Sequence, residues 1–246
     1  MSSGDSGLDW LTERPIAHRG LHDLNRECWE NTLPAFERAC RKGYAIECDV
    51  TISADGVPVV IHDTNLVRLT GKYGWTYRHS ARTLRSMRIG RTRDHIPLLR
   101  DLLDLVDGKV PLLIELKSAR RFDGPLVEAV AHALADYPGK AAIMTFDHHL
   151  IRRFPTDAGE TPTGITAEGL DDRAMEAHFS MLAYGVGFVS YRVGALQNRF
   201  VRFMRDRLSA PLLTWTVRDP ETAELARSQG AQITFEGFEP PLAALP

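Results

Sequence analysis

The sequence predicts an α/β protein, and its length of 246 residues fits a single α/β barrel. Short apolar runs alternate with helical patterns almost from end to end, which is typical of repeated βα units around a parallel sheet. The composition, with 43% hydrophobic and 25% charged residues, is that of a globular protein with a sizeable core. We see no linker, internal repeat or low-complexity segment, and we therefore expect one domain over residues 1–246.

Eight apolar runs are expected to form the strands of the sheet. In chain order they are RPIAHR, YAIECDV, VPLLIELK, KAAIMTF, PTGITA, GVGFVSY, PLLTWTV and AQITF. Eight strands separated by helical segments are the number that a closed barrel of βα units requires.

The segments between these runs carry helix start and stop signals. The segment 33–43 has Pro34 in its first turn and Gly43 just past its end. The segment 219–230 repeats the pattern, with Asp219 as a candidate N-cap and Gly230 at its end. Both segments are predicted to be helices.

A ninth run, VPVVIHD, follows the second strand too closely for a helical crossover, which needs a dozen or more residues. The pair Asp55-Gly56 is a turn signal, so the two runs are expected to form a β-hairpin. If these two residues are the central turn residues, Asp49 lies opposite His62. Glu47 shares a face with Asp49 because side chains alternate along a strand. The hairpin therefore gathers two carboxylates and one imidazole.

The least regular part of the chain is residues 64–109, which we expect to form an insertion or a cover over the barrel mouth before and around the helix LLRDLLDLV. Arginine residues cluster here between Arg78 and Arg100, and we interpret the cluster as a solvated face. The formal net charge of the whole chain is -2, which indicates neither nucleic acid nor an anionic membrane as a partner.

The N-terminal stretch MSSGDSGLDWLTERP is polar and unlike a signal peptide, and no later run is long enough to span a membrane. We therefore expect a cytoplasmic protein without stable membrane insertion. The three cysteines, Cys28, Cys40 and Cys48, lack CxxC spacing and predict neither a disulfide framework nor a zinc site. The sequence gives no indication of the oligomeric state.

Four short polar motifs stand at the ends of apolar runs: HRG, ECD, HD and ELK. The carboxyl ends of barrel strands gather at one face, where active sites lie, so these motifs are expected to meet in one pocket. Glu47, Asp49 and Glu115 offer hard oxygen ligands suited to Mg²⁺ or Ca²⁺. His18 and His62 form a proton donor and acceptor pair near neutral pH.

Two cationic side chains accompany these groups and suggest a phosphate. Arg19 offers a guanidinium fork and Lys117 a point charge. Taken singly, each group is explained by a purely structural role, such as a solvated carboxylate, a core histidine or a Glu115–Lys117 ion pair. The apolar neighbours of the motifs favour the site. Trp215 packs in the barrel or lines an apolar subsite.

Together these motifs resemble the glycerophosphodiester phosphodiesterase family. The run IAHRG, the tripeptide ENT with the helix AFERACRKG, the hairpin, LVRLTG, LIELK and TWTV follow that family's order from residue 15 to residue 235. The resemblance implies a TIM-type (β/α)8 barrel with a β-hairpin after the second strand and a small inserted excursion.

The resemblance further implies a metal-dependent hydrolysis. It implies that one divalent cation, Mg²⁺ or Ca²⁺, is bound by Glu47, Asp49 and Glu115. It also implies that His18 and His62 are the general acid and the general base, and it leaves open which histidine has which role. The cation polarises the phosphodiester, the neighbouring glycerol hydroxyl attacks, and water opens the cyclic phosphate. The products are an alcohol and glycerol 3-phosphate.

On the substrate side, the resemblance implies that Arg19 and Lys117 hold the phosphate of a small-molecule phosphodiester and that Glu30 and Asn31 line the site. The last strand departs from the family's Thr-Asp-Pro-like element, since ITFEGFEP places Glu236 two residues after the threonine. The late loops that shape the alcohol subsite are therefore open to change.

Two alternative functions stay open at this point. One is a phospholipase D-like hydrolysis of lysophospholipids, which similar barrels support. The other is a catalytically inactive barrel that serves as a binding module, against which the retained histidines and carboxylates count. The sequence does not set the head-group preference or decide between Mg²⁺ and Ca²⁺.

Overall fold

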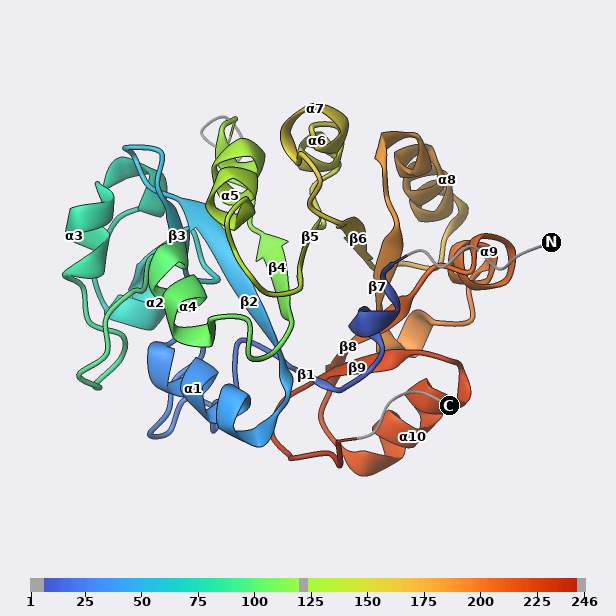
Figure 1. The fold of residues 1–246 in the computed structure, drawn as a ribbon, viewed down its shortest axis with the longest axis horizontal. Coiled ribbons are helices and arrows are strands. Elements are labelled where there is room, and N and C mark those ends of the chain that lie inside the picture. Colours follow the sequence, from blue (N-terminus) through green and yellow to red (C-terminus); the bar gives the residue numbers. More distant parts are fainter. Residues whose placement is uncertain (1–6, 120–123, 243–246) are drawn as a thin grey trace.

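The computed structural model describes residues 7–119 and 124–242 (Figure 1). Nine strands form one sheet in the order β1-β9-β8-β7-β6-β5-β4-β2-β3, and an additional β1–β2 pairing closes it. Eight parallel strands make the barrel, while β3 pairs antiparallel with the outer part of β2. The strands are β1 (Ile16–Ala17), β2 (Ala45–Ile52), β3 (Pro58–Val60), β4 (Leu112–Leu116), β5 (Ala141–Thr145), β6 (Thr163–Ala167), β7 (Phe188–Arg192), β8 (Leu212–Val217) and β9 (Gln232–Phe235).

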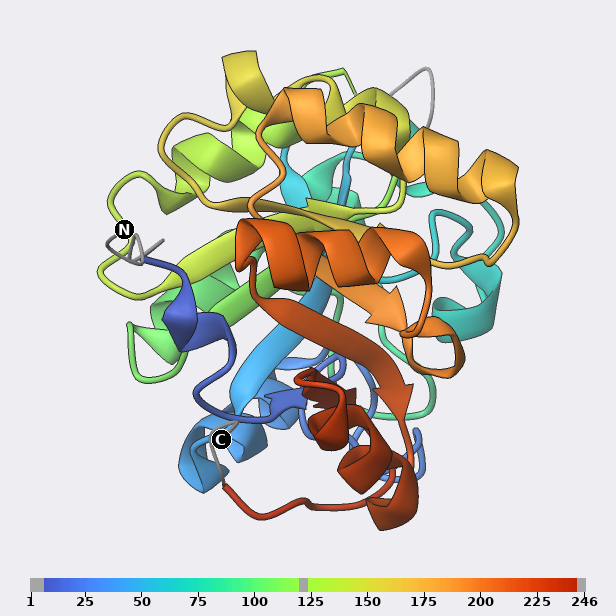
Figure 2. The ribbon, with the colours of Figure 1, turned by 90° about the vertical axis from the view of Figure 1, so that its right-hand side faces the viewer.

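Helices surround the barrel and cover the outer face of its strands (Figures 1 and 2). They are α1 (Leu33–Lys42), α2 (Val67–Thr70), α3 (Ala81–Arg85), α4 (Leu99–Val106), α5 (Leu126–Leu134), α6 (His148–Ile151), α7 (Phe154–Asp157), α8 (Asp172–Met181), α9 (Arg199–Leu208) and α10 (Pro220–Ser228). Short 3₁₀ helices include η1 (Asp9–Leu11) and η2 (Thr76–Arg78). The TIM-type barrel expected from the sequence is confirmed, and each of the eight predicted runs overlaps one barrel strand.

The two predicted helix signals are present in the structure. Thr32 caps α1 through a hydrogen bond from the Ala35 amide, and Gly43 ends the helix at a φ of 77°. Asp219 caps α10 by accepting from the Thr222 amide at 2.8 Å. Side-chain oxygens satisfy the free amides of a first helical turn, while glycine adopts the left-handed conformation that ends a helix.

Side-chain alternation along the strands separates two apolar cores. Ile46, Cys48 and Val50 of β2 belong to the large core between strands and helices. A smaller core inside the barrel includes Leu113 and Phe188, together with Trp10 and Leu11 of η1. Because residues one position apart point to opposite faces, the side chains between those of the outer core point into the barrel.

The hairpin of β2 and β3 forms as predicted, but its register differs by one residue. Val50 pairs with Val60, and the Ile61 amide donates to the Asp49 carbonyl at 3.0 Å, so Ile61 and not His62 lies opposite Asp49. The loop has three residues instead of two, since the Ser53 amide donates to the Val57 carbonyl. The Ser53 hydroxyl accepts from the Val57 amide at 2.9 Å and stabilises this longer loop.

The excursion after β3 contains α2, η2 and α3, and α4 packs against α1 as part of the helical layer. Seven buried side chains of β3 and the excursion make a separate small core: Val59, Ile61, Leu66, Leu69, Leu84, Ile89 and Ile96. Among the described residues, no helix combines the length and apolar character needed to cross a bilayer. Cys28, Cys40 and Cys48 are free thiols.

Candidate active site

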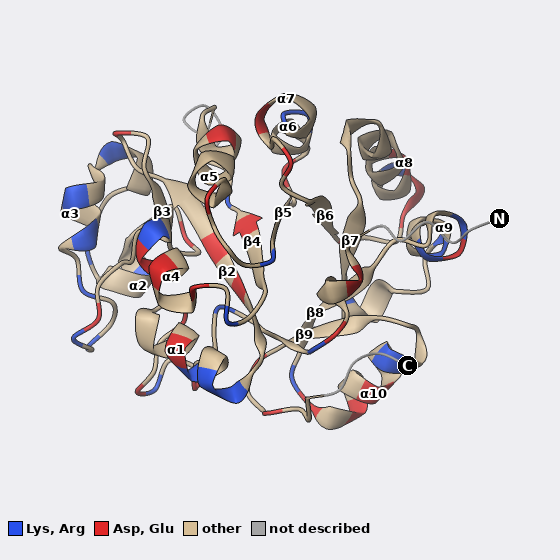
Figure 3. Ribbon diagram, in the orientation of Figure 1, with Lys and Arg blue, Asp and Glu red and all other residues tan. Residues whose placement is uncertain are grey.

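Three carboxylates gather inside the carboxyl end of the barrel. Glu47 and Asp49 lie two residues apart on β2, and Asp49 is in register with Glu115 on β4. Figure 3 shows acidic residues on both strands. One oxygen from each of the three side chains lies within 4.8 Å of the others, and the side chains are buried, with Glu47 and Asp49 only 1% exposed.

Burial and mutual repulsion make this cluster electrostatically costly. Burial raises the pKa of Glu47, and the charges of Asp49 and Glu115 raise it further. Burial also raises the pKa of Glu115, against the effect of Lys117. Burial would raise the pKa of Asp49 as well, but Lys117 and Arg19 hold it below its ordinary value.

Two cationic side chains partly compensate the cluster. The Lys117 ammonium donates to Glu115 and lies 3.0 Å from Asp49 Oδ1. The Arg19 guanidinium lies 3.2 Å from Asp49 Oδ2 through Nε and donates to Glu30 at 2.8 Å through Nη1. Both cations are mostly buried, since each side chain is only 18% exposed.

The chain after β1 reaches the cluster because its backbone is tightly constrained. The Arg19 amide donates to Glu47 Oε2 at 2.9 Å, and Arg19 has a φ of 55°. The next residue, Gly20, has a φ of 79°, and a Cβ atom there would lie 2.9 Å from the Ala35 backbone. Glycine is therefore required for this loop to lie against the start of α1.

Glu30 and Asn31 make hydrogen bonds to Arg19 and Asp49, respectively. The Asn31 amide group donates to Asp49 Oδ2 at 2.8 Å, and its oxygen accepts from the Asp49 amide. Glu30 accepts from Arg19 and also from Arg68 of the excursion. Both residues are buried, so they hold Asp49 and Arg19 in place and do not face the cavity.

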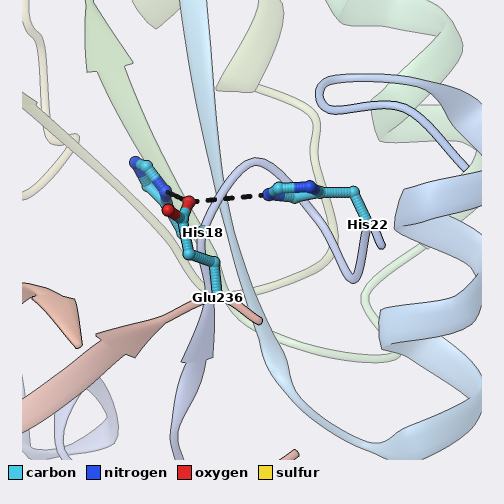
Figure 4. Close-up of side chains that lie close together, drawn as sticks. All are labelled: His18, His22 and Glu236. Atoms are coloured by element: carbon cyan, nitrogen blue, oxygen red, sulfur yellow. Dashed lines mark hydrogen bonds and ion pairs between the residues drawn. The ribbon is translucent and has the colours of Figure 1, made fainter. Parts of the chain in front are cut away.

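His18 follows β1 and makes a close hydrogen-bond contact with Glu236, which follows β9 (Figure 4). His18 Nδ1 lies 2.6 Å from Glu236 Oε2, while the other carboxylate oxygen accepts from Arg218 Nε at 2.8 Å. His22 Nε2 lies 3.6 Å from the same Oε2. Burial would raise the pKa of Glu236, but the hydrogen bond with His18, the nearby His22 imidazole and the charge of Arg218 keep it well below its usual range.

The cluster of His18, His22 and Glu236 has the composition of a metal site, yet its hydrogen bonds favour protons between the groups. The Leu24 amide donates to His22 Nδ1 at 3.1 Å, so Nδ1 is the unprotonated nitrogen of this ring. The proton of the neutral ring is then on Nε2, which points to Glu236. A metal ion at this Nε2 would require the opposite tautomer and would oppose the Leu24 contact.

His62 follows β3 and has a similar pair of neighbours. Its Nδ1 lies 2.6 Å from Asp63 Oδ1, and Arg68 Nε donates to Asp63 Oδ2 at 2.6 Å. Burial lowers the pKa of both His62 and His18 and so favours the neutral form of each ring. In each case a proton on Nδ1, held by the carboxylate, leaves Nε2 as the free proton acceptor.

A cavity of about 230 Å³ opens at this end of the barrel. Seven of the ten predicted site residues line it: His18, Arg19, Glu47, His62, Glu115, Lys117 and Trp215. The Trp215 indole donates to the Ser190 carbonyl at 3.3 Å, and its ring contacts Phe146 edge to face with centroids 5.1 Å apart. Trp215 thus both packs against the barrel wall and faces the cavity.

Sequence reasoning missed the carboxylates that contact the two histidines. Glu236 entered the sequence analysis only as a departure in the last strand, and Asp63 only as the second residue of the HD motif. The signal for Glu236 was its position directly after a strand, which is also the position of His18. Because β1 pairs with β9, the two chain-distant strand ends meet at His18 and Glu236.

The carboxylate cluster fits a divalent cation. Glu47 Oε1 is buried and has no hydrogen-bond partner, although it is an anionic oxygen that needs one. The donors are all carboxylate oxygens, which are the ligands that Mg²⁺ and Ca²⁺ prefer. A cation among Glu47, Asp49 and Glu115 would satisfy the unpaired oxygen and remove the repulsion.

The closed barrel of eight parallel strands defines the class of the protein as a TIM-type barrel. Solved structures share this fold. A phosphodiesterase of Oleispira antarctica, solved in complex with the product sn-glycerol-3-phosphate, is 21% identical, with a TM-score of 0.78 over 90% of this chain and 91% of that one. A glycerophosphodiester phosphodiesterase of Thermotoga maritima is 22% identical, with a TM-score of 0.68 over 89% and 92% of the two chains.

The comparison of sequences identifies the family of TIM-type barrels to which the chain belongs. Residues 18–234 match the model of the glycerophosphoryl diester phosphodiesterase family. A glycerophosphodiester phosphodiesterase of Caldanaerobacter subterraneus subsp. tengcongensis is 31% identical over 147 residues, which make up 56% of this chain and 59% of that protein. The chain belongs to the glycerophosphoryl diester phosphodiesterase family, whose members are phosphoric diester hydrolases.

Proposed function

We propose that this protein hydrolyses glycerophosphodiesters to an alcohol and glycerol 3-phosphate, with one divalent cation bound by Glu47, Asp49 and Glu115. The observation that carries the proposal is the meeting of this buried carboxylate cluster with His18 and His62 around one cavity. The family membership and the glycerol 3-phosphate bound to the Oleispira relative support the same substrate class.

The phosphate of the substrate is held by cationic side chains at the cavity wall. Arg19 and Lys117 both line the cavity and both already contact carboxylates, so they are oriented before substrate binds. A guanidinium and an ammonium placed around a phosphodiester stabilise the charge on its non-bridging oxygens. The bound cation supplies additional Lewis-acid stabilisation of that charge.

Proton transfer is the role of the two histidines. One neutral ring accepts the proton of the attacking glycerol hydroxyl through Nε2, and the other ring, in its protonated form, donates to the oxygen of the departing alcohol, which leaves a cyclic phosphate. Water then opens the cyclic phosphate to glycerol 3-phosphate, with the two rings exchanging roles. Glu236 and Asp63 hold the Nδ1 protons and stabilise each imidazolium when it forms. Arg218 and Arg68 fix these carboxylates.

The test is release of glycerol 3-phosphate from glycerophosphocholine by the purified protein. The protein is treated with EDTA and then supplied with Mg²⁺ or Ca²⁺ separately. Turnover that either ion restores supports the proposal and names the ion. A folded, metal-binding sample without turnover would contradict it, and lysophosphatidylcholine is then the substrate to test for the alternative lysophospholipid hydrolysis.

A further inference from the structure

The segment between β3 and α4 carries charge of one sign. From Thr64 to Arg93 the chain has eight Lys or Arg residues and no Asp or Glu, although the formal net charge of the whole protein is -2. Two of the eight are paired, Arg68 with Asp63 and Glu30, and Arg85 with Asp101. The other six are exposed and have no ion pair within residues 7–119 and 124–242: Lys72, Arg78, Arg82, Arg88, Arg91 and Arg93.

Exposed aromatic and apolar side chains accompany these cations. Tyr73 is 91% exposed and Trp75 is 41% exposed. Trp75 stacks on Tyr77 with ring centroids 5.9 Å apart, and Val67 of α2 is also exposed. Tyr and Trp rings combine an apolar body with a polar atom, and they concentrate where protein meets the headgroup region of a membrane.

This basic segment, residues 64–93, lies beside the mouth of the barrel. Val67 and Arg68 line a cavity of about 560 Å³ together with His62 and Lys117. In Figure 2 the teal excursion lies on the side toward which the arrowheads of β7 and β8 point. Figure 3 shows blue patches along α3 at the edge of the molecule. The excursion that carries these cations therefore lies on the same side of the barrel as the cavity of the histidines.

We propose that the basic segment docks the protein on an anionic phospholipid surface, with the barrel mouth turned toward the lipid headgroups. This revises our interpretation of the arginine cluster as a merely solvated face. The choice of lipid rests on the proposed function, because a glycerophosphodiester and a phospholipid share the unit glycerol, phosphate and alcohol. The exposed Val67, Tyr73 and Trp75 favour a membrane interface over a nucleic-acid duplex, whose backbone needs only the cations and whose stacked bases offer these side chains no partner.

The electrostatic contribution of the segment sets the size of the expected effect. Each Lys or Arg side chain close to an anionic bilayer increases the affinity by about fivefold. Replacement of three of them by glutamine is then expected to weaken vesicle binding by about 10²-fold. High salt is expected to weaken the wild-type interaction, because exposed charges are screened.

The experiment is co-sedimentation of the full chain with two kinds of extruded vesicles, pure phosphatidylcholine and an equal mixture of phosphatidylcholine and phosphatidylglycerol. The test variant is Arg82→Gln/Arg88→Gln/Arg91→Gln. The matched control is Arg173→Gln/Arg202→Gln/Arg207→Gln, which removes the same charge from exposed positions on α8 and α9, on the opposite side of the barrel in Figure 1. Tyr73→Ser tests the aromatic contribution at a side chain that packs on almost nothing.

We expect the wild type to bind the mixed vesicles only, and high salt to weaken this binding. The test variant is expected to lose the binding and the control variant to keep it. Tyr73→Ser is expected to bind more weakly than the wild type. Equal binding by test and control variants would overturn the proposal, as would the absence of binding to the mixed vesicles. Tighter binding to an RNA duplex than to vesicles at equal phosphate concentration would reassign the surface. Turnover of soluble glycerophosphocholine is measured on the wild type and on every variant. If the wild type turns over this substrate but does not bind vesicles, the docking surface alone is refuted. If the wild type binds vesicles but does not turn over this substrate, the proposed function alone is refuted.

Discussion

Two histidines approach one cavity from different strands, and each has a carboxylate 2.6 Å from its Nδ1 and an arginine on that carboxylate. The two arrangements differ in how the carboxylate arrives. Asp63 is the chain neighbour of His62, whereas Glu236 comes from the far end of the sequence. His18 and Glu236 are also the more buried pair, since their side chains are 13% and 12% exposed against 31% and 23% for His62 and Asp63.

Removal of either imidazole tests the assignment of proton transfer. We expect His18→Ala and His62→Ala each to lower kcat for glycerophosphocholine by roughly 10²-fold or more, the usual contribution of a general acid or base. His149→Ala is the matched control, because His149 is exposed on α6 and does not line the cavity. Wild-type turnover in either test variant, with a native circular dichroism spectrum, would refute the role of that histidine.

Removal of the charge of Glu236 tests its role as a positioning residue for His18. In Glu236→Gln the shape is kept, but the anion that holds the Nδ1 proton and stabilises the imidazolium is lost. We expect kcat to fall by about tenfold or more while KM changes little, because Arg19 and Lys117 are untouched. Steady-state kinetics with Glu239→Gln as the control gives the answer, and an unchanged kcat would remove Glu236 from the mechanism.

At the scale of elements, the hairpin shows how one residue in a loop changes which side chains face each other. The Asp55-Gly56 pair predicts a two-residue turn, but Ser53 extends it to three through its hydroxyl. A shift of one residue reverses the faces of a whole strand. Ile61 therefore packs in the small core of the excursion, and His62 reaches the cavity from the chain beyond β3.

The packing of α8 predicts a pH-dependent stability. His178 is buried against Tyr191 and Phe200, and burial, with His148 nearby, lowers its pKa from 6.5 to about 4. Between these two values the unfolded chain binds the proton more readily than the folded protein. Stability is therefore expected to be lost as the pH falls from about 6.5 toward about 4.

His178→Leu removes this titration, so the decrease in melting temperature between neutral pH and pH near 4.5 is expected to be smaller in the variant than in the wild type. Thermal denaturation followed by circular dichroism at both pH values measures the difference. His132→Leu, at an exposed position on α5, serves as the comparison. Identical pH dependence in wild type and His178→Leu would show that the buried ring does not titrate in this range.

In the whole molecule, closure of the barrel brings the carboxylates of Glu47, Asp49 and Glu115 together. Their mutual repulsion destabilises the folded protein when no cation is bound. A cation that binds only the folded state raises the melting temperature in proportion to the logarithm of its concentration over Kd. We expect Mg²⁺ or Ca²⁺ to raise the melting temperature of the EDTA-treated protein.

The same charges predict the behaviour of Glu47→Gln. Without metal this variant is expected to be as stable as the wild type or more so, because one repelling charge is gone, and its response to the cation is expected to be largely lost. Glu128→Gln, on the exposed face of α5, is the matched control and is expected to respond like the wild type. A full response to metal in Glu47→Gln would exclude Glu47 as a ligand.

The assignment of all 246 residues to one domain stays a prediction, as do the catalytic, metal and substrate roles of the individual residues. What the sequence predicted well were features with a local cause. Apolar runs separated by capped helices predicted the eight barrel strands, α1 and α10. Carboxylates at alternate positions of a strand predicted a shared face for Glu47 and Asp49.

Local patterns in the sequence were enough to predict the barrel, the gathering of the carboxylates and the approach of the two histidines, because strand periodicity and the common direction of parallel strands bring those side chains to one end. The partners of these groups follow from the tertiary structure alone. The contact between His18 and Glu236 requires β1 to pair with β9, and the contact between Arg68 and Glu30 requires the excursion to fold back over the loop after β1. Such contacts depend on closure of the barrel and on side chains long enough to bridge elements that are distant in the chain. No local pattern in the sequence indicates either.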